Sequence, residues 1–348
     1  MKLAVVLFNL GGPDSLDSVE PFLRNLFNDP AILSLPWILR KPLSMFIARR
    51  RAPFARDIYT KLGGSSPILA ETRAQAGALD KVLVGGGVDA KCFVAMRCWK
   101  PFSDEVAEHV KAWGADRIVL LPLYPQFSTT TSASSFADWT RAAAQAGVAL
   151  PTTRICCYPD AAGFIAAEVA LIRQALTDLR PDAGYRLLLS AHGLPKRTTA
   201  KGDPYQWQVE RTAQAIVDGL GIKDLDWSVC YQSRVGPLEW IGPATDAEIR
   251  RAGAEGKGVI VAPIAFVSEH SETLVELDME YAHLAEACGV PDCRRVPAVR
   301  THPDFIAALA SLVMQATDAG STISGAGGRI CPSSRTACPH RETITCRT

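Results

Sequence analysis

Six short apolar runs, each closed by polar, glycine or proline residues, constrain the fold of this chain more than any other feature. They are KLAVVLFNLGGP, KCFVAMRCWKP, RIVLLPLYPQFS, YRLLLSAHGLP, WSVCYQSRVGP and GVIVAPIAFVSEH, and TTRICCYP is a weaker seventh. Amphipathic stretches such as FSDEVAEHVKAWG and AGFIAAEVALIRQAL lie between them. Continuous apolar strands that alternate with helices are typical of parallel sheets covered by helices on both faces. The sequence therefore predicts an α/β fold.

The apolar runs form two sets, one before about residue 150 and one after it. The 348 residues are enough for two domains of ordinary size, and 48% of them are hydrophobic, which is enough for two cores. We expect two similar Rossmann-like domains, residues 1–150 and 151–310, whose parallel sheets are flanked by helices and face each other across a cleft. Residues 311–348 then form a C-terminal extension.

One run, LLLSAHGLPKR, ends abruptly at His192, which Gly193 and Pro195 follow. In open α/β sheets ligands bind beyond the carboxyl ends of the strands, and His192 stands at such an end. A lone histidine is more often structural than catalytic, but this position favours a functional role. Neutral imidazole can bind a metal ion or accept a proton near pH 7, so His192 is a candidate for either task.

Four acidic residues, Glu269, Glu272, Glu276 and Glu280, follow the strongest apolar run. On an α-helix their spacing stacks the carboxylates along one face. A solvated helix face would explain one such pair, since like charges at this spacing cost only about 0.2–0.5 kcal/mol. Four carboxylates that begin at the carboxyl end of a strand, with few lysines beside them, instead favour a path for a divalent cation or for protons.

Weaker signals stand at the ends of other runs. Arg97, Tyr124 and Gln126 follow two runs of the first half and could line the same cleft. The segment NLGGP could hold an anion on backbone amides, but it lacks the glycine spacings of dinucleotide and triphosphate sites.

An apolar segment with interrupting prolines, DPAILSLPWILRKPLSMFIARRRAPF, spans residues 29–54 and contains Arg49, Arg50 and Arg51. It is equally consistent with a helical hairpin of the core and with an apolar lip over a cleft or against a membrane, flanked by cations for anionic groups. As a lip it would touch a bilayer surface through Leu33, Leu35, Trp37, Ile38 and Leu39.

The overall charge and the chain's start restrict its partners and location. The formal net charge is +1, which gives no support to nucleic-acid binding. The first apolar run lacks a signal-peptide cleavage site, and no run is long enough to span a membrane. We therefore expect a cytoplasmic protein, at most peripheral to the inner membrane, whose ten cysteines are reduced thiols or metal ligands.

The residues that close these runs also resemble the motifs of a known family. LLLSAHGLPKR with GDPY, YQSRVGPLEWIGP and PIAFVSEHSETLVELDMEY look like those of ferrochelatase, as do NLGGPDS, RRRAP, LGGSSPI and LYPQFS, so the resemblance reaches to about residue 310. It implies two similar α/β domains that hold protoporphyrin IX between them under an apolar lip. It also implies insertion of ferrous iron to form protohaem, the last step of haem biosynthesis.

The resemblance implies a role for each candidate residue. His192 matches the family's active-site histidine and Glu272 its carboxylate partner, and the two would handle the ferrous iron and the pyrrole protons. Glu276 and Glu280 would continue an acidic path, and Glu269 stands where many relatives have an aspartate. The porphyrin-binding residues implied are Leu10, Arg50, Arg51, Arg97, Tyr124 and Trp240.

The extension is rich in Gly, Ser and Thr and has no helical or strand period, but it carries Cys331, Cys338 and Cys346. Three thiols in one short segment of a cytosolic protein suggest a metal centre. Some ferrochelatases hold a 2Fe-2S cluster with three C-terminal cysteines and one from the body of the chain. The resemblance therefore implies such a cluster here, while zinc or free thiols remain alternatives.

The fourth ligand of that cluster is less defined by the sequence. The position that supplies it in animal relatives is Thr129 here. We select Cys157 in RICCYP as the ligand, with Cys156 or His340 as alternatives.

Two other functions fit the same features. A non-enzymatic protein that closes on haem or a metal chelate would share the cleft and lip but would not need an acidic row beside a histidine. A chelatase for another tetrapyrrole and metal would have the same kind of site. Insertion assays with protoporphyrin, coproporphyrin and sirohydrochlorin distinguish the three.

Overall fold

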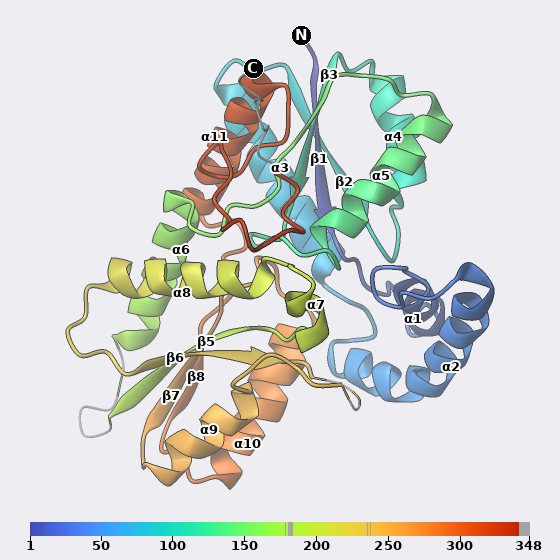
Figure 1. The fold of residues 1–348 in the computed structure, drawn as a ribbon. Helices are drawn as coiled ribbons and strands as arrows, with labels where there is room; N and C mark the ends of the chain where they lie inside the picture. The colour runs from blue at the N-terminus through green and yellow to red at the C-terminus, as the bar shows by residue number, and fades with distance from the viewer. Residues whose placement is uncertain (178, 180–183, 235, 237, 341–348) are drawn as a thin grey trace.

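The computed structural model describes residues 1–177, 179, 184–234, 236 and 238–340, and its strands form two four-stranded sheets. The first has the order β2-β1-β3-β4 and the second β6-β5-β7-β8, so the same topology occurs twice (Figure 1). Every strand pair is parallel. The strands are β1 Leu3–Asn9, β2 Ala90–Met96, β3 Arg117–Pro122, β4 Thr152–Arg154, β5 Tyr185–His192, β6 Trp227–Gln232, β7 Gly258–Pro263 and β8 Cys293–Arg295. The predicted pair of Rossmann-like α/β domains is confirmed.

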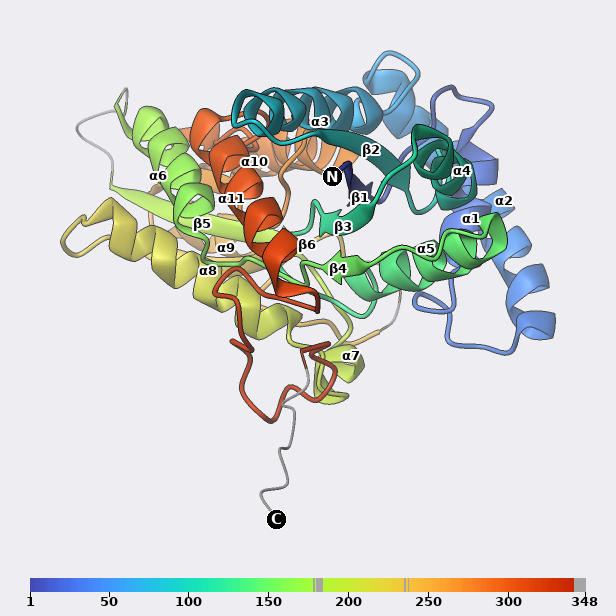
Figure 2. The same ribbon diagram turned by 90° about the horizontal axis from the view of Figure 1, so that it is seen from above.

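Helices cover both faces of each sheet (Figures 1 and 2). They are α1 Val19–Phe27, α2 Trp37–Lys61, α3 Ile68–Gly85, α4 Ser103–Trp113, α5 Ser132–Ala146, α6 Ala162–Leu176, α7 Lys196–Ala200, α8 Tyr205–Leu220, α9 Thr245–Ala254, the π-helix η1 Glu272–Tyr281, α10 Ala282–Ala287 and α11 Pro303–Ala319. The acidic stretch, predicted as a helix, is a π-helix. The short and polar strand β8 was not predicted.

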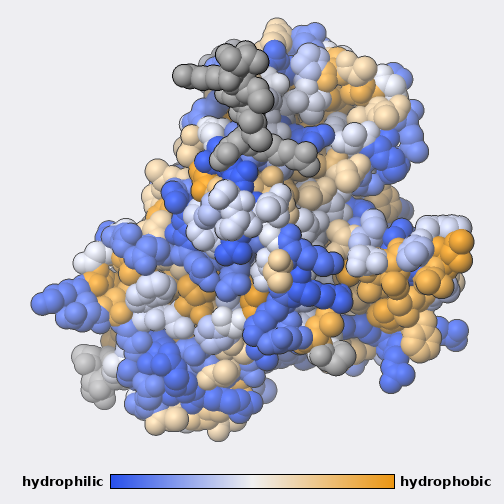
Figure 3. All heavy atoms as spheres, viewed as in Figure 1, coloured by the Kyte–Doolittle hydropathy of each residue, from blue (hydrophilic) through white to orange (hydrophobic). Residues whose placement is uncertain are grey.

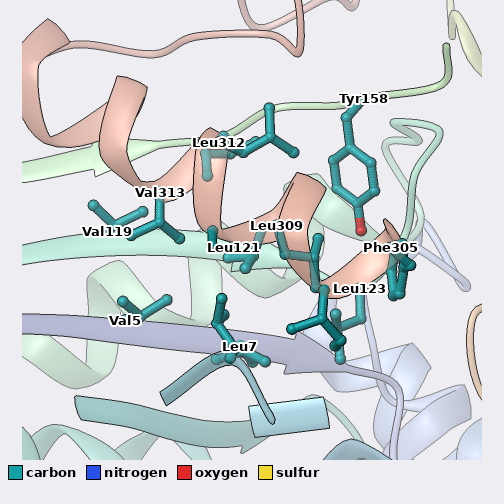
Figure 4. Close-up of a cluster of buried hydrophobic side chains, with 14 of the residues drawn as sticks. Val5, Leu7, Val119, Leu121, Leu123, Tyr158, Phe305, Leu309, Leu312 and Val313 are labelled. Atoms are coloured by element: carbon teal, nitrogen blue, oxygen red, sulfur yellow. The ribbon is translucent and has the colours of Figure 1, made fainter. Parts of the chain in front are cut away.

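The cores follow from the alternation of side chains along fully buried strands. Along β1, Leu3, Val5 and Leu7 face α3 and α11, and the intervening residues face α4 and α5. Figure 4 shows the first of these clusters, in which Val5 and Leu7 lie beneath side chains of β3 and α11. Because both faces are apolar, each strand reads as a continuous hydrophobic run in the sequence.

The chain returns to its first half after the second sheet. Helix α11 follows β8 but packs against α3, α6, β3 and β4. The last strand of the first sheet, β4, lies just beyond residue 150. The division of the chain at residues 150 and 310 stays a prediction, and α11 ties the two halves together across it.

Helices α1 and α2 form a separate layer at one side of the first sheet. One face of α2 is buried against α1 through Ala48 and Ala52. The other leaves Trp37, Ile38 and Phe46 exposed, and Figure 3 shows hydrophobic surface gathered over this part of the molecule. The helix α2 thus has one buried face and one exposed apolar face, and its role as a lip stays a prediction. Among the described residues, no helix is long and apolar enough to cross a bilayer.

The extension has no helix or strand among residues 320–340, as expected, yet it is packed. Ile323, Cys331 and Cys338 are buried. The Cys156 amide donates to the Ile323 carbonyl at 2.7 Å, and the Ala337 amide donates to the Gly202 carbonyl at 3.2 Å. Figures 1 and 2 both place the extension beside α7 and the start of α8. Residues 320–340 are therefore an ordered part of the body of the protein.

Candidate active site

His192 is the last residue of β5, and the turn that follows fixes its imidazole. Its Nδ1 lies 2.6 Å from the Gly193 carbonyl oxygen. Because a carbonyl only accepts, Nδ1 carries the proton and Nε2 of the neutral ring keeps its lone pair. Gly193 is needed here because a Cβ would lie 3.0 Å from the Gln232 carbonyl oxygen and 3.2 Å from the Trp240 ring. Trp240, selected from the sequence, therefore packs beside the histidine turn.

Glu272 lies between two imidazoles. Its Oε1 is 3.7 Å from Nε2 of His192, and its Oε2 is 3.6 Å from Nε2 of His270. Nδ1 of His270 lies 3.0 Å from the Ser268 carbonyl oxygen, so this ring also keeps its Nε2 lone pair toward the carboxylate when neutral. His270 was not among the residues predicted from the sequence. Its signal was its place in SEH, just beyond the carboxyl end of β7.

The electrostatics of the site keep Glu272 ionised. Burial alone would raise the pKa of Glu272, but the charge of His192 and the hydrogen bond and charge of His270 lower it to about 2. The carboxylate of Glu272 therefore stays negative at any working pH.

The π-helix η1 places the next acid of the row. Its wider turn brings residues five apart together, and the Tyr281 hydroxyl donates to Glu276 at 3.0 Å. Glu276 also accepts hydrogen bonds from the Ser233 amide and hydroxyl and from Gln232. Burial and the charge of Glu272 raise the pKa of Glu276. Glu280, one turn further, is exposed, so the row runs from the histidines to the surface.

The remaining acid of the predicted path has a separate environment. Glu269 is buried and forms two hydrogen bonds with Arg295 at 2.9 and 3.1 Å, and it accepts the Ala298 amide. Burial would raise the pKa of Glu269, but Thr273, Arg295 and Ala298 together lower it. The carboxylate thus joins η1 to the strand β8.

The predicted porphyrin residues of the first domain lie beyond β1, β2 and β3. Arg97 forms an ion pair with the buried Asp29 at 2.9 Å, so its charge is compensated within the protein. Tyr124 is half-buried, and its hydroxyl lies beside Ser135. Leu10 packs against the α1–α2 cluster.

The basic residues of α2 differ in exposure. Arg50 is exposed, whereas Arg51 is half-buried and lies over the Phe27 ring at 5.8 Å.

Two first-domain residues outside the predicted set reach the acidic segment. Tyr59 of α2 is buried beside Ser271, next to Glu272. Gln75 of α3 is fully buried and donates to the Val267 and Arg300 carbonyls, at 2.7 and 3.0 Å, while it accepts the Ser268 hydroxyl. The two domains are thus fastened together at the segment that carries His270 and Glu272.

A second group of side chains gathers at the extension. The thiols of Cys156 and Cys157 are 3.4 Å apart, and the pKa of Cys157 is raised by Cys156, by burial and by Cys331 and Cys338. A hydrogen bond from Cys331 lowers the pKa of Cys338 to about 6. Cys346 lies outside the described residues. Across the described ranges no three His, Cys, Asp or Glu side chains stand in a ready-made metal-binding arrangement.

Thr129 and the backbone of His340 form other hydrogen bonds near the extension. The Thr129 amide and hydroxyl donate to Asp203 at 2.7 and 2.6 Å. The His340 carbonyl accepts the Cys338 thiol at 3.9 Å.

Comparison with known proteins decides the family. The family model described as Ferrochelatase matches residues 2–317. The chain belongs to the ferrochelatase family. Ferrochelatases are lyases that insert ferrous iron into protoporphyrin to form protohaem. Similar proteins named Ferrochelatase come from Caulobacter vibrioides, 52% identical over 98% of each chain, and from Pelagibacter ubique, 49% identical over 97% of this chain and 98% of the relative.

The fold of this ferrochelatase also occurs among other chelatases. The sirohydrochlorin chelatase SirB of Bacillus subtilis subspecies spizizenii, solved in complex with cobalt, has a TM-score of 0.52 at 13% identity over 91% of this chain and 95% of that one. At this identity the similarity concerns the fold alone.

Proposed function

We propose that iron insertion takes place at His192, Glu272 and His270, and that His192 is the base. The observation that supports this most is the arrangement of two imidazoles whose Nε2 lone pairs face one carboxylate, at 3.7 and 3.6 Å. Insertion of Fe²⁺ replaces two pyrrole N–H protons, so the site must accept two protons while the porphyrin is bound. Two imidazoles match this requirement, and Glu272 stabilises each imidazolium that forms.

The protons then leave along η1. Glu276 has a raised pKa and lies next to Glu272, so it can take a proton from the imidazolium pair. Glu280 passes it to water because its side chain is exposed. The fixed position of Glu276, held by Ser233, Gln232 and Tyr281, supports this relay.

The porphyrin is proposed to lie between the two domains. In this arrangement Trp240 packs on the macrocycle next to His192, and the opposite wall carries Leu10, Arg97 and Tyr124. Holding the ring in a distorted form exposes its nitrogens and lowers the barrier to insertion. The exposed Arg50, with Arg51 beside it, is proposed to meet the propionates.

Replacement of His192 tests this proposal. We expect His192→Ala to lower iron and zinc insertion by about 10²–10⁴-fold, the usual contribution of a general base, while porphyrin binding persists. Loss of the free-base porphyrin spectrum measures insertion, and fluorescence quenching measures binding. The matched control is His109→Ala, an exposed histidine of α4, which should keep full activity. Normal turnover of His192→Ala would contradict the assignment of His192 as the base.

The extension is proposed to hold a 2Fe-2S cluster through Cys157, Cys331, Cys338 and Cys346. Buried thiols from two distant parts of the chain lie near one another, and soft sulfur donors suit iron–sulfur clusters, so the described residues fit the group. Bound, the cluster supplies a one-electron centre and a cross-link between the extension and the body of the chain.

Iron and sulfide content and visible absorption test this site. We expect wild-type protein to contain both elements and to be coloured, and Cys338→Ser to lose both, because it removes a ligand. Cys293→Ser, at a half-buried thiol of β8, should keep them. Colourless wild-type protein without sulfide contradicts the cluster.

Location and domain limits complete the proposal. The exposed apolar side chains of α2, with Arg40 and Lys41 among them, support peripheral contact of a cytoplasmic enzyme with the inner membrane, and such contact suits a poorly soluble porphyrin substrate. Residues 1–150 and 151–310 are proposed as the two domains, with 311–348 as the extension.

A further inference from the structure

Gln208 on α8 is fully buried and connects the extension to the first domain. Its Oε1 accepts the Phe127 amide at 2.7 Å, and its Nε2 donates to the Cys331 sulfur at 3.1 Å. A backbone amide can only donate, so the oxygen of this side chain must face Phe127. The NH₂ group therefore points at the sulfur, and the N–H···S contact is fixed by the partner at the other end.

Neighbouring contacts hold the extension against the same helix. The Ala337 amide donates to the carbonyl of Gly202 at 3.2 Å, and Gly202 lies three residues before α8 begins at Tyr205. Gly202 has φ +91°, and a Cβ there would lie 2.2 Å from the Thr336 hydroxyl oxygen. The segment from Cys331 to Cys338 is thus seated closely on the start of α8, which makes the sulfur contact of Gln208 part of a built interface.

We propose that Gln208 is the positioning residue for Cys331 as a cluster ligand and that its N–H···S hydrogen bond raises the reduction potential of the cluster. This rests on the 2Fe-2S site proposed above. A hydrogen bond to a ligand sulfur withdraws electron density from it and stabilises the more negative, reduced cluster. The other end of the same amide holds Phe127, three residues after Tyr124 on the first-domain wall. Gln208 thereby couples the cysteine site to the loop that borders the porphyrin.

Redox titration of loaded protein tests this role. Gln208→Met keeps the volume and removes both hydrogen bonds, whereas Gln208→Glu keeps an oxygen for Phe127 and removes the N–H donor. We expect both variants to shift the midpoint potential of the cluster to more negative values. The matched control is Gln126→Met, which removes a buried amide that also joins the two domains, through Thr212 and the Ile264 carbonyl, without touching a sulfur. Its potential should equal that of the wild type.

The outcomes separate this proposal from the cluster itself. Potentials of both Gln208 variants equal to the wild-type value overturn the role of Gln208 and leave the cluster standing. Wild-type protein without cluster overturns both. If Gln208→Met and Gln208→Glu fold, as judged by circular dichroism, but bind no cluster while Gln126→Met does, the positioning role is supported. If Gln208→Met does not fold, the potential of Gln208→Glu alone decides.

Discussion

Glu168 is a buried carboxylic acid far from the acidic row of the candidate site. It lies on α6, is fully buried, and neither of its carboxylate oxygens has a hydrogen-bond partner within the described part of the chain. Burial raises its pKa to about 8. The carboxyl group is therefore protonated in the folded protein at neutral pH, whereas in the unfolded chain it ionises near its ordinary value of 4.5.

This predicts a specific pH dependence of stability. Between pH 4.5 and about 8 the folded state binds a proton at Glu168 that the unfolded state has released, so the free energy of unfolding falls as the pH rises. Glu168→Gln removes this dependence. The gain in the free energy of unfolding of the variant over the wild type should therefore be larger at pH 8 than at pH 5, by on the order of 3 kcal/mol. Urea unfolding at both pH values measures it. An unchanged difference between wild type and Glu168→Gln contradicts the prediction.

Single residues were predictable from the sequence where a strand end or a spacing marked them. His192 and Glu272 carried such marks, and the structure brings them together. Gln75 and Gln208 carried none, because their partners lie in other parts of the chain and a glutamine has no pattern of its own. Arg97 was selected from the sequence, but its ion pair with the buried Asp29 was not predictable, because Asp29 lies 68 residues earlier in the chain.

At the scale of single elements, η1 shows what the acidic spacing could not reveal. The spacing of the acids is compatible with an α-helix and with a π-helix, since both place residues four apart close together. The Tyr281–Glu276 hydrogen bond, across five residues, belongs to the wider turn. The π-helix is accompanied by that contact and by the hydrogen bond from the Ser233 amide to Glu276. Ser233 lies directly after β6, in a different part of the chain.

The exposed face of α2 predicts membrane binding. The triple variant Trp37→Ser, Ile38→Ser and Phe46→Ser removes large exposed apolar area, and it should weaken binding to anionic liposomes by at least about tenfold. Liposome flotation measures it. Val82→Ser with Val84→Ser, two exposed apolar residues of α3, is the control and should bind as the wild type does. Equal flotation of all three proteins contradicts the role of α2.

At the scale of the whole molecule, α11 closes the structure by returning to the first half. Its close approach to α6 depends on Gly163, where a Cβ would lie 2.4 Å from the Asp304 carbonyl oxygen and 2.9 Å from Ala308. The apolar runs predicted the sheets because parallel strands are buried on both faces. They could not predict strand order or the return of α11, since both depend on contacts between segments far apart in the chain.

Gly163→Ala tests the importance of this packing. The added methyl group meets backbone that cannot move easily, so we expect a loss of about 1–3 kcal/mol in the free energy of unfolding. Gly77→Ala, in α3, is the control because its Cβ meets nothing within 4 Å, and it should be neutral or stabilising by about 0.5–1 kcal/mol. Urea midpoints compare the two. A Gly163→Ala variant as stable as Gly77→Ala would show that the helices separate without cost.

The seating of the extension has a consequence for the order of events during synthesis. The cysteine site draws on Cys156 and Cys157, directly after the first sheet, on a helix of the second domain, and on residues 331–338. When the ribosome has synthesised both sheets, which end with β8, residues 331–338 have still to be made. A group bound jointly by these residues can acquire all of these ligands only after residues 331–338 have been synthesised. Its presence in a purified sample therefore reports molecules in which the two domains and residues 331–338 have come together.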